Sequence, residues 1–266
     1  MSTFPENALN AAPVVALRGV GKAFANGVVA LDRFDLDVRP GEFLTLLGPS
    51  GCGKSTALRL IAGLAAPTSG HIEWAGGQMP AQRARDLGFV FQESTLMPWA
   101  TVFDNVYLPL RLAGTARPAA ADRVMEALGR VGLADFAQVY PRELSGGMKM
   151  RTSIARALVT QPRLLLMDEP FAALDEITRF RLNDDLLTLW QSLGKTVVFV
   201  THSVFESVYL SGRIVVMTPR PGRVAATLDI DAPYPRDPSF RTSARYGELC
   251  RMVSDSLADA MARSAA

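Results

Sequence analysis

The sequence predicts an α/β fold in which helices and strands alternate around a mainly parallel sheet. Strand-like runs alternate with helical runs over the second half of the chain, which is typical of parallel α/β architecture. The first part of the chain is rich in strand-forming residues separated by turn signals, which favours an N-terminal antiparallel β subdomain. Residues from about 101 to 158 change to helical periodicity, which indicates an inserted helical subdomain.

The N-terminal part contains three strand-like runs, VVALRGV, VVALDRFDLDV and EFLTLL. Turn signals at Asn26-Gly27 and at Pro40-Gly41 separate them. Within the second run, LDRFDLDV alternates apolar and polar residues, as a half-buried strand does. The third run continues into GPSGCGKST and the helical stretch STALRLIAGL, so we expect a strand–loop–helix unit here.

Further along the chain, HIEWAG and LGFVF are expected to be strands, followed by the helical runs TVFDNVYLPLRLAG, ADRVMEALGRVGL and GGMKMRTSIARAL. Strand-like LLLM and VVFV then alternate with helices that begin near Asp175 and Val204. RIVVM is expected to be a strand, PRPGRVAATLDI a turn with an edge strand, and about 240–262 a C-terminal helix. We therefore predict a disordered lead-in at 1–12, a main domain at 13–230 with the helical insertion at about 93–158, and a C-terminal helical extension at 231–266.

The composition is that of a globular protein, with 48% apolar and 20% charged residues. A formal net charge of +2 is too small to indicate a nucleic-acid partner. Because only Cys52 and Cys250 are present, we expect reduced thiols, with neither a disulfide framework nor a metal-ligand cluster. The N-terminus lacks a signal-peptide pattern, and no run approaches the roughly 18 apolar residues of a membrane-spanning helix. We expect a soluble protein, or one held at a membrane through partners.

The segment GPSGCGKS matches the phosphate-binding pattern G-x-x-x-x-G-K-[ST] directly after a strand and before a helix. Its glycines let backbone N–H groups surround phosphates, Lys54 reaches the β- and γ-phosphates, and the Ser55 hydroxyl is offered to Mg²⁺. The expected nucleotide-binding residues are Gly48, Pro49, Ser50, Gly51, Cys52, Gly53, Lys54, Ser55 and Thr56, the last of which adds a contact to the α-phosphate. The alternative is a simple glycine-rich turn, and the flanking strand argues against it.

A second motif, LLLMDEP, follows at residues 164–170. A buried apolar strand is expected to end at Asp168, where the carboxylate would hold Mg²⁺ through its water shell. Glu169 is expected to orient or deprotonate an attacking water. The alternative is an acidic pair that caps a helix, and the presence of the phosphate-binding loop favours the catalytic interpretation.

A third motif, LSGGMKMR at 144–151, begins another expected helix. Ser145, Gly146 and Gly147 leave their backbone N–H groups unobstructed at its N-terminus, which makes a second possible anion site.

With GPSGCGKST, LSGGMKMR and LLLMDEP in this order, the chain resembles the nucleotide-binding subunit of an ABC transporter from about Val14 to Arg223. The LSGG sequence in this position is highly specific to ABC ATPases. The resemblance implies a P-loop NTPase core, ATP and Mg²⁺ as ligands, and a homodimer packed head to tail. Each LSGG would close over the ATP held by the other subunit, so that Ser145 and the Gly147 N–H bind a γ-phosphate from across the interface. Any side chain at 146 or 147 would then keep the backbone from that phosphate.

The resemblance implies roles for four more positions. Gln92, in FVFQES, matches the glutamine that contacts Mg²⁺ and the attacking water and links to the membrane partner. Asp175, in AALD, belongs to the D-loop, and His202, in VFVTHS, matches the switch histidine that contacts the γ-phosphate. Phe24 occupies the place of the aromatic that stacks on adenine, with an ordinary core phenylalanine as the alternative. The other histidine, His71, is expected to be structural.

Departures from the family pattern remove no catalytic group. Met148 and Met150 stand where many members have glutamine, Ser203 where aspartate often follows the histidine, and Gly212 where aspartate is frequent before arginine. We therefore expect a competent ATPase.

Three further stretches, GGMKMRTSIARAL, MDEPFAALDEITR and THSVFESVYLSGRIVVMTPRPGR, are similar to importer ATPases for nitrate, sulfonates, taurine and pyrimidine precursors. The resemblance implies separate integral-membrane permease subunits, an external solute-binding protein as an indirect partner, and a peripheral location on the cytoplasmic face of the bacterial inner membrane. An exporter ATPase and a non-transport ABC ATPase are the alternatives. The cargo itself is read by other subunits.

A candidate contact with the permease lies in Glu93–Trp99, which ends in Leu96, Met97, Pro98 and Trp99. These residues are expected to line a groove for a short permease helix, because buried tryptophans often anchor interfaces. The alternative is that Trp99 belongs to the core of the helical subdomain.

Overall fold

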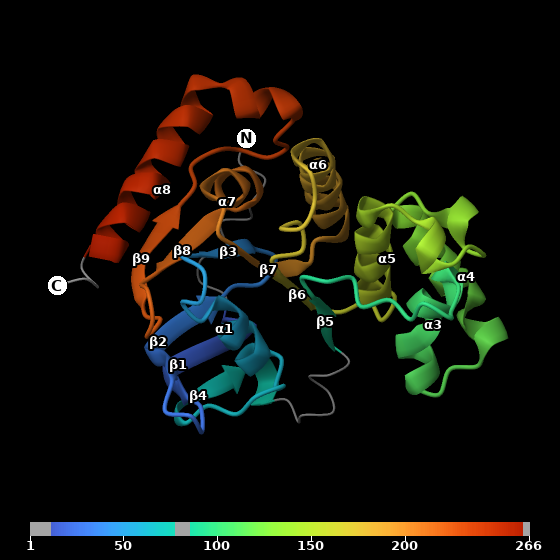
Figure 1. Cartoon of the computed structure of the whole chain (residues 1–266), viewed down its shortest axis with the longest axis horizontal. Coiled ribbons are helices and arrows are strands. Elements are labelled where there is room, and N and C mark those ends of the chain that lie inside the picture. Colours follow the sequence, from blue (N-terminus) through green and yellow to red (C-terminus); the bar gives the residue numbers. More distant parts are fainter. Residues whose placement is uncertain (1–11, 78–85, 263–266) are drawn as a thin grey trace.

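The structure is a computed structural model that describes residues 12–77 and 86–262. The first eleven residues of the expected lead-in and the last four of the expected extension lie outside this range. Nine strands within it form two sheets (Figure 1). The α/β class, the antiparallel β subdomain and the helical insertion are confirmed.

The smaller sheet is antiparallel and has the order β2-β1-β4. Its strands are β1 (Val15–Ala23), β2 (Val29–Val38) and β4 (Ser69–Trp74). The alternating pattern noticed in the second run is visible in β2, where buried residues alternate with more exposed ones. His71 in β4 lies at the surface, with its Nε2 2.9 Å from Glu73 Oε1.

The larger sheet has the order β5-β6-β7-β3-β8-β9 and is parallel except for its last strand. Its strands are β3 (Phe43–Leu47), β5 (Leu87–Val90), β6 (Leu164–Asp168), β7 (Thr196–Thr201), β8 (Arg213–Met217) and β9 (Val224–Asp229). The third N-terminal run is therefore a central strand of this sheet, and β9 is the expected edge strand. This order brings the carboxyl ends of β3, β6 and β7 together, although long stretches of chain separate them.

Helices cover both faces of the larger sheet and form a lobe beyond β5 (Figure 1). The lobe consists of α3 (Val102–Leu112), α4 (Arg117–Arg130) and α5 (Gly146–Leu158). The remaining helices are α1 (Lys54–Ile61), α6 (Glu176–Leu193), α7 (Val204–Leu210) and α8 (Ala244–Ala262). Helix α8 begins later than expected because residues 238–242 form a separate 3-10 turn capped by Asp237.

Two apolar cores lie on opposite faces of the larger sheet. Phe43 and Phe199 belong to the core that includes α6, α7 and α8 and extends into the helical lobe. Their neighbours in sequence, Leu44 and Val198, belong to the core shared with α1 and the smaller sheet. Successive strand residues point to opposite faces, so continuous apolar strands can fill both cores.

A buried ion pair fixes β8 beside the turn that precedes β3. Arg213 donates from Nε and Nη2 to the two carboxylate oxygens of Glu42, at 3.0 and 2.7 Å. The same guanidinium donates to the Asp37 carbonyl at 2.5 Å. Three hydrogen bonds therefore compensate the burial of the charges.

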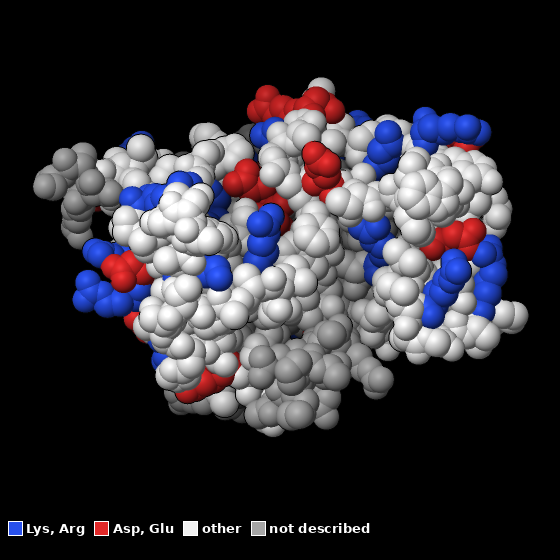
Figure 2. Space-filling view, turned by 60° about the horizontal axis from the view of Figure 1, so that its bottom comes forward, with Lys and Arg blue, Asp and Glu red and all other residues white. Residues whose placement is uncertain are grey.

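The face shown in Figure 2 mixes basic and acidic side chains over both lobes, and most of its surface belongs to uncharged residues. None of the helices within residues 12–77 and 86–262 has both the length and the apolar character needed to cross a bilayer.

Candidate active site

The phosphate-binding loop connects β3 to α1, as expected. Gly53 has φ of 110° and forms the N-cap of α1. A Cβ atom at this position would lie 2.7 Å from the Ala30 carbonyl oxygen, so both the backbone angle and the space require glycine. The loop therefore presents unhindered backbone N–H groups at a helix N-terminus.

Lys54 lies inside this loop and is only 3% exposed. Its Nζ donates to the carbonyls of Gly48 and Pro49, at 2.9 and 3.0 Å, and lies 3.5 Å from Glu169 Oε1. A buried ammonium group requires such partners. The loop therefore holds a positive charge at its centre.

Asp168 ends β6 beside the first residues of α1. Ser55 Oγ donates to Asp168 Oδ1 at 2.7 Å. Burial raises the pKa of Asp168, the hydrogen bond from Ser55 lowers it, and the nearby Glu169 charge raises it. A hydroxyl and a carboxylate from distant parts of the chain thus lie within one hydrogen bond.

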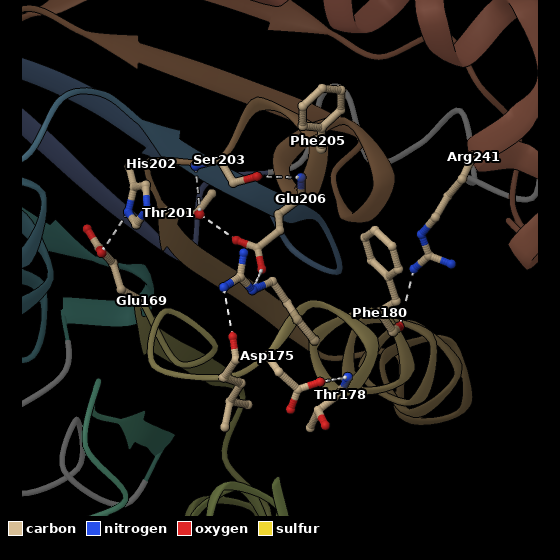
Figure 3. A network of polar contacts seen from close by, with 12 residues as sticks. Glu169, Asp175, Thr178, Phe180, Thr201, His202, Ser203, Phe205, Glu206 and Arg241 are labelled. Carbon is tan, nitrogen blue, oxygen red and sulfur yellow. Dashed lines mark hydrogen bonds and ion pairs between the residues drawn. The ribbon is translucent and has the colours of Figure 1, made fainter. Parts of the chain in front are cut away.

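Glu169 and His202 are brought together because β6 and β7 are neighbours in the sheet. Asp168 pairs with Val200, so both strands end at the same level. Glu169 Oε2 lies 3.0 Å from His202 Nδ1, as Figure 3 shows. The Glu169 backbone has φ of 45°, an unusual conformation for a non-glycine residue that recurs at functional sites. The carboxylate thereby faces both Lys54 and His202.

A cavity of about 160 Å³ opens over the phosphate-binding loop. Its lining combines residues of the β subdomain, including Phe24 and Val28, with residues of the loop and Glu169. Phe24 is 44% exposed, so the interpretation of this side chain as a core residue is wrong. The complete lining is Phe24, Val28, Ala30, Gly51, Gly53, Lys54, Ser55, Thr56, Glu169 and Arg220.

The LSGG segment lies away from this cavity. Figure 1 places α5, which begins at Gly146, in the helical lobe on the far side of β5 and β6 from α1. Ser145 is exposed and caps α5 by accepting from the Met148 N–H at 3.3 Å. The two phosphate-binding patterns therefore belong to different faces of one chain.

The family model described as ABC transporter matches residues 31–172. An uncharacterised ABC transporter ATP-binding protein from Methanocaldococcus jannaschii is 48% identical over 239 residues, which cover 90% of this chain and 88% of the relative. The chain belongs to the ABC transporter family. It is an ATP-binding ATPase of that family.

Relatives with transport names are also similar over most of the chain. A taurine import ATP-binding protein from Rhizobium johnstonii is 47% identical, and the match covers 78% of this chain and 79% of the relative. An aliphatic sulfonates import ATP-binding protein from Bacillus cereus is 40% identical, and the match covers 90% of this chain and 94% of the relative. The structure is similar to a dimeric bacterial ABC transporter cassette, with a TM-score of 0.71, 33% identity, and coverage of 82% of this chain and 99% of the cassette.

The signature glycines of this ABC ATPase also have a role inside their own chain. A Cβ atom on Gly147 would lie 2.9 Å from Thr178 Cγ2 of α6, and one on Gly146 would lie 3.2 Å from Leu174 Cδ2. The sequence pattern explains glycine at 146 and 147 by the access that a phosphate needs to the backbone. The contact with α6 adds a second requirement for glycine at 147, which no local pattern displays.

Two of the other expected site residues lie outside the cavity. Gln92 is exposed and follows β5 by two residues. Asp175 caps α6 by accepting from the Thr178 N–H at 2.9 Å. One chain by itself thus groups the phosphate-binding loop, Asp168, Glu169 and His202, and places Ser145, Gln92 and Asp175 apart from the cavity.

Arg220 belongs to the cavity but was not predicted from the sequence. Its Nε and Nη2 donate to the Gly51 carbonyl at 3.1 and 2.9 Å. It comes from the turn between β8 and β9, 169 residues away from Gly51. Its only sequence signal is a basic residue in PRPGR, which by itself indicates a turn.

Trp99 is 77% exposed, so its interpretation as a core residue is wrong. The segment that carries it is nevertheless fixed. The buried Asn105 donates to the Met97 and Ala100 carbonyls, and Arg156 donates to the carbonyls of Ser94 and Thr95.

An apolar groove of about 330 Å³ lies next to this segment between β5, α3 and α5. Its lining includes Phe89, Phe91 and Leu108. Among the described residues that line it, Thr95 is the one that belongs to Glu93–Trp99. None of Leu96–Trp99 lines this groove, and the expected contact of these residues with a permease stays a prediction.

Proposed function

We propose that this protein is the ATP-hydrolysing subunit of an ABC importer and works as a head-to-tail homodimer on separate permease subunits. The observation that carries the proposal is the position of Glu169 between Lys54 and His202 beside the phosphate-binding loop. The relatives named for import of taurine and aliphatic sulfonates support uptake rather than export or a non-transport role. The solute is then a small molecule of the taurine, sulfonate, nitrate or pyrimidine-like class.

ATP fits the cavity over the loop. Phe24 offers an aromatic face for the adenine ring. Backbone N–H groups at the start of α1 and the Lys54 ammonium supply positive charge for the phosphates. The residues assigned to the nucleotide are Phe24, Gly48, Pro49, Ser50, Gly51, Cys52, Gly53, Lys54, Ser55 and Thr56.

Mg²⁺ fits the pair formed by Ser55 and Asp168. The family resemblance adds Gln92 as a further metal ligand, and Gln92 would have to approach the cavity from its exposed position to fill this role. The hydroxyl and carboxylate oxygens of the pair already lie 2.7 Å apart at the edge of the cavity. Magnesium in nucleotide sites takes one or two such protein oxygens together with phosphates and water. When bound, the ion would neutralise charge on the β- and γ-phosphates.

Glu169 acts as the general base, and His202 orients it. The carboxylate accepts the proton of the attacking water, and Lys54 at 3.5 Å stabilises its charge before the transfer. The His202 imidazole, 3.0 Å from the same carboxylate, fixes its direction and would contact the γ-phosphate. Gln92 would assist by positioning the water once it approaches the cavity.

The second half of each site is assigned to the other subunit. Within one chain, Ser145, Gly146 and Gly147 lie at the start of α5, in the helical lobe away from α1 and its phosphate-binding loop. The similarity to a dimeric cassette supports an arrangement in which these residues, with Asp175, complete the partner's site. Two complete sites then form from two chains.

The permease is assigned to the groove beside Trp99. An exposed tryptophan on a fixed segment next to an apolar groove has the chemistry of an interface anchor. A short amphipathic helix from a membrane subunit fits such a groove. The protein would then lie on the cytoplasmic face of the bacterial inner membrane, and the external solute-binding protein would reach it only through the permease.

The hydrolytic assignment is tested with Glu169→Gln, which keeps the shape of the side chain and removes the base. ATP binding should persist, and turnover should fall by about 10²–10⁴-fold, the usual cost of losing a general base. Glu248→Gln, an exposed residue of α8, is the matched control and should hydrolyse ATP normally. Near-normal turnover of Glu169→Gln would refute the assignment.

The import assignment is tested by uptake of labelled taurine, an alkanesulfonate, nitrate and a pyrimidine precursor. Cells that express this subunit with its permease and solute-binding protein should accumulate one of them, and cells with the Glu169→Gln subunit should not. Efflux of solute from loaded cells would favour the exporter alternative.

A further inference from the structure

The signature segment of one chain is connected to the catalytic residues of the same chain through a line of side-chain contacts. The line starts where Leu174, in the D-loop, packs against Gly146. Arg179 Nη2 then donates to the Leu174 carbonyl at 2.9 Å. The first turns of α6 therefore hold the loop that rests on the signature segment.

The other end of the line reaches His202. Thr201 Oγ1 donates to Glu206 Oε2 at 2.5 Å, and the Ser203 N–H donates to Thr201 Oγ1 at 3.0 Å. The Glu206 N–H in turn donates to Ser203 Oγ at 3.3 Å. Glu206 thus fixes the residues on both sides of His202, as Figure 3 shows.

Arg179 and Glu206 face each other between these two ends. Arg179 Nε lies 3.9 Å from Glu206 Oε1, which is an ion pair but too long for a hydrogen bond. Both atoms are buried, and neither has a hydrogen-bond partner among the described residues. Buried groups of this kind are normally paired. A shift of about 1 Å would join them, because charged hydrogen bonds span about 2.7–2.9 Å.

In the structure the pair is apart, and the coupling requires a second arrangement in which the two groups are joined. Burial raises the pKa of Glu206, and the hydrogen bond from Thr201 and the charge of Arg179 oppose this rise. Arg179 is one of several groups that stabilise the Glu206 carboxylate, and the opposite charges attract each other across the gap. Movement of the loop at Leu174 would change the separation and so change how firmly the His202 segment is held.

The C-terminal extension holds the helices on the far side of this pair. Arg241 donates to the Phe180 carbonyl of α6 at 3.3 Å and pairs with Asp184 at 2.7 Å. Tyr246 donates to the Phe205 carbonyl of α7 at 3.0 Å. With α6 and α7 anchored there, a displacement of the D-loop acts on the Arg179–Glu206 pair.

We propose that Arg179 and Glu206 are positioning residues that couple the signature segment to His202 within one chain. The proposal rests on the proposed function, because the signature segment would sense the partner's ATP while His202 serves the chain's own ATP. In the dimer, ligand binding at one composite site would then set the switch histidine of the other. Neither residue lines the cavity over the phosphate-binding loop.

The test uses Glu206→Gln, Arg179→Met and the double variant in the full-length protein. Glu206→Gln keeps an acceptor for Thr201 and removes the charge that faces Arg179. We expect each single variant to lower kcat by about 2- to 30-fold, the range of mutations that alter coupling. The KM for ATP should stay within about twofold, because no nucleotide contact is lost. The kcat of the double variant should be no lower than that of the slower single variant, since the effects of substitutions at two contacting residues do not add.

A second measurement reports the signature end of the link. In a Glu169→Gln background, each variant should need more ATP for half-maximal dimerisation by size-exclusion chromatography. Glu126→Gln and Arg130→Met remove an exposed ion pair on α4 and are the matched controls. Both controls should keep kcat and dimerisation unchanged.

Three results would overturn the link. The first is that the losses in kcat of the two single variants multiply in the double variant. The second is that kcat of a single variant falls while its ATP-dependent dimerisation is unchanged. The third is that its thermal midpoint falls while kcat per folded molecule is unchanged. Wild-type protein without ATP hydrolysis would instead refute the proposed function, and the link with it, before any variant is compared.

Discussion

Replacement of Trp99 by alanine separates a docking role from a folding role, because the structure predicts very different magnitudes for the two. The side chain is 77% exposed, and Asn105 and Arg156 hold its segment through contacts that the substitution leaves intact. Surface substitutions of this kind change the free energy of unfolding by about 0.5 kcal/mol or less. Loss of a central interface anchor costs about 2 kcal/mol or more of binding free energy. That corresponds to a permease affinity about 30-fold weaker.

The assay compares thermal unfolding of the free subunit with its co-purification with the permease. Trp99→Ala should unfold at nearly the wild-type temperature, bind ATP normally, and lose co-purification, transport and permease-stimulated hydrolysis. Trp190→Ala is the matched control, because Trp190 is 7% exposed and packs edge-on against Phe43. Truncation of a buried tryptophan costs about 3–5 kcal/mol, so this variant should lose stability. A Trp99→Ala subunit that is destabilised but still co-purifies would refute the docking assignment.

Three further predictions follow from the site and the fold. Mixed dimers of Lys54→Ala and Ser145→Arg subunits should keep at most one intact composite site, and Glu169→Gln protein should dimerise with ATP by mass action. Monomeric Glu169→Gln protein at saturating ATP and Mg²⁺ would contradict the shared site. Arg220→Ala should weaken ATP binding by about 2- to 10-fold, the range for one net hydrogen bond, whereas Arg223→Ala in the same turn should not. Equal affinities by calorimetry would remove Arg220 from the site. Arg213→Leu should cost about 3–5 kcal/mol in denaturant unfolding, because it leaves a buried carboxylate unpaired, and a loss below about 1 kcal/mol would show that the pair is dispensable.

The sequence by itself determined the local units of this protein. The loop from Gly48 to Ser55, the acidic end of β6 and the helix start at Gly146 were each predicted from a short pattern. Such patterns record backbone requirements within a few residues, as the φ of 110° at Gly53 illustrates. The order of these motifs was enough to indicate the ABC transporter family and an ATPase.

Only the tertiary structure decided which distant side chains meet. The strand order β5-β6-β7-β3-β8-β9 places Glu169 beside His202 and brings Arg220 from the β8–β9 turn onto the phosphate-binding loop. The closeness of Gly147 to Thr178 and of Arg179 to Glu206 depends on how neighbouring helices pack against one another. Hydrophobic periodicity fixes which face of an element is buried, but many neighbours satisfy the same periodicity. The choice among them depends on packing over the whole domain, which a linear pattern does not display.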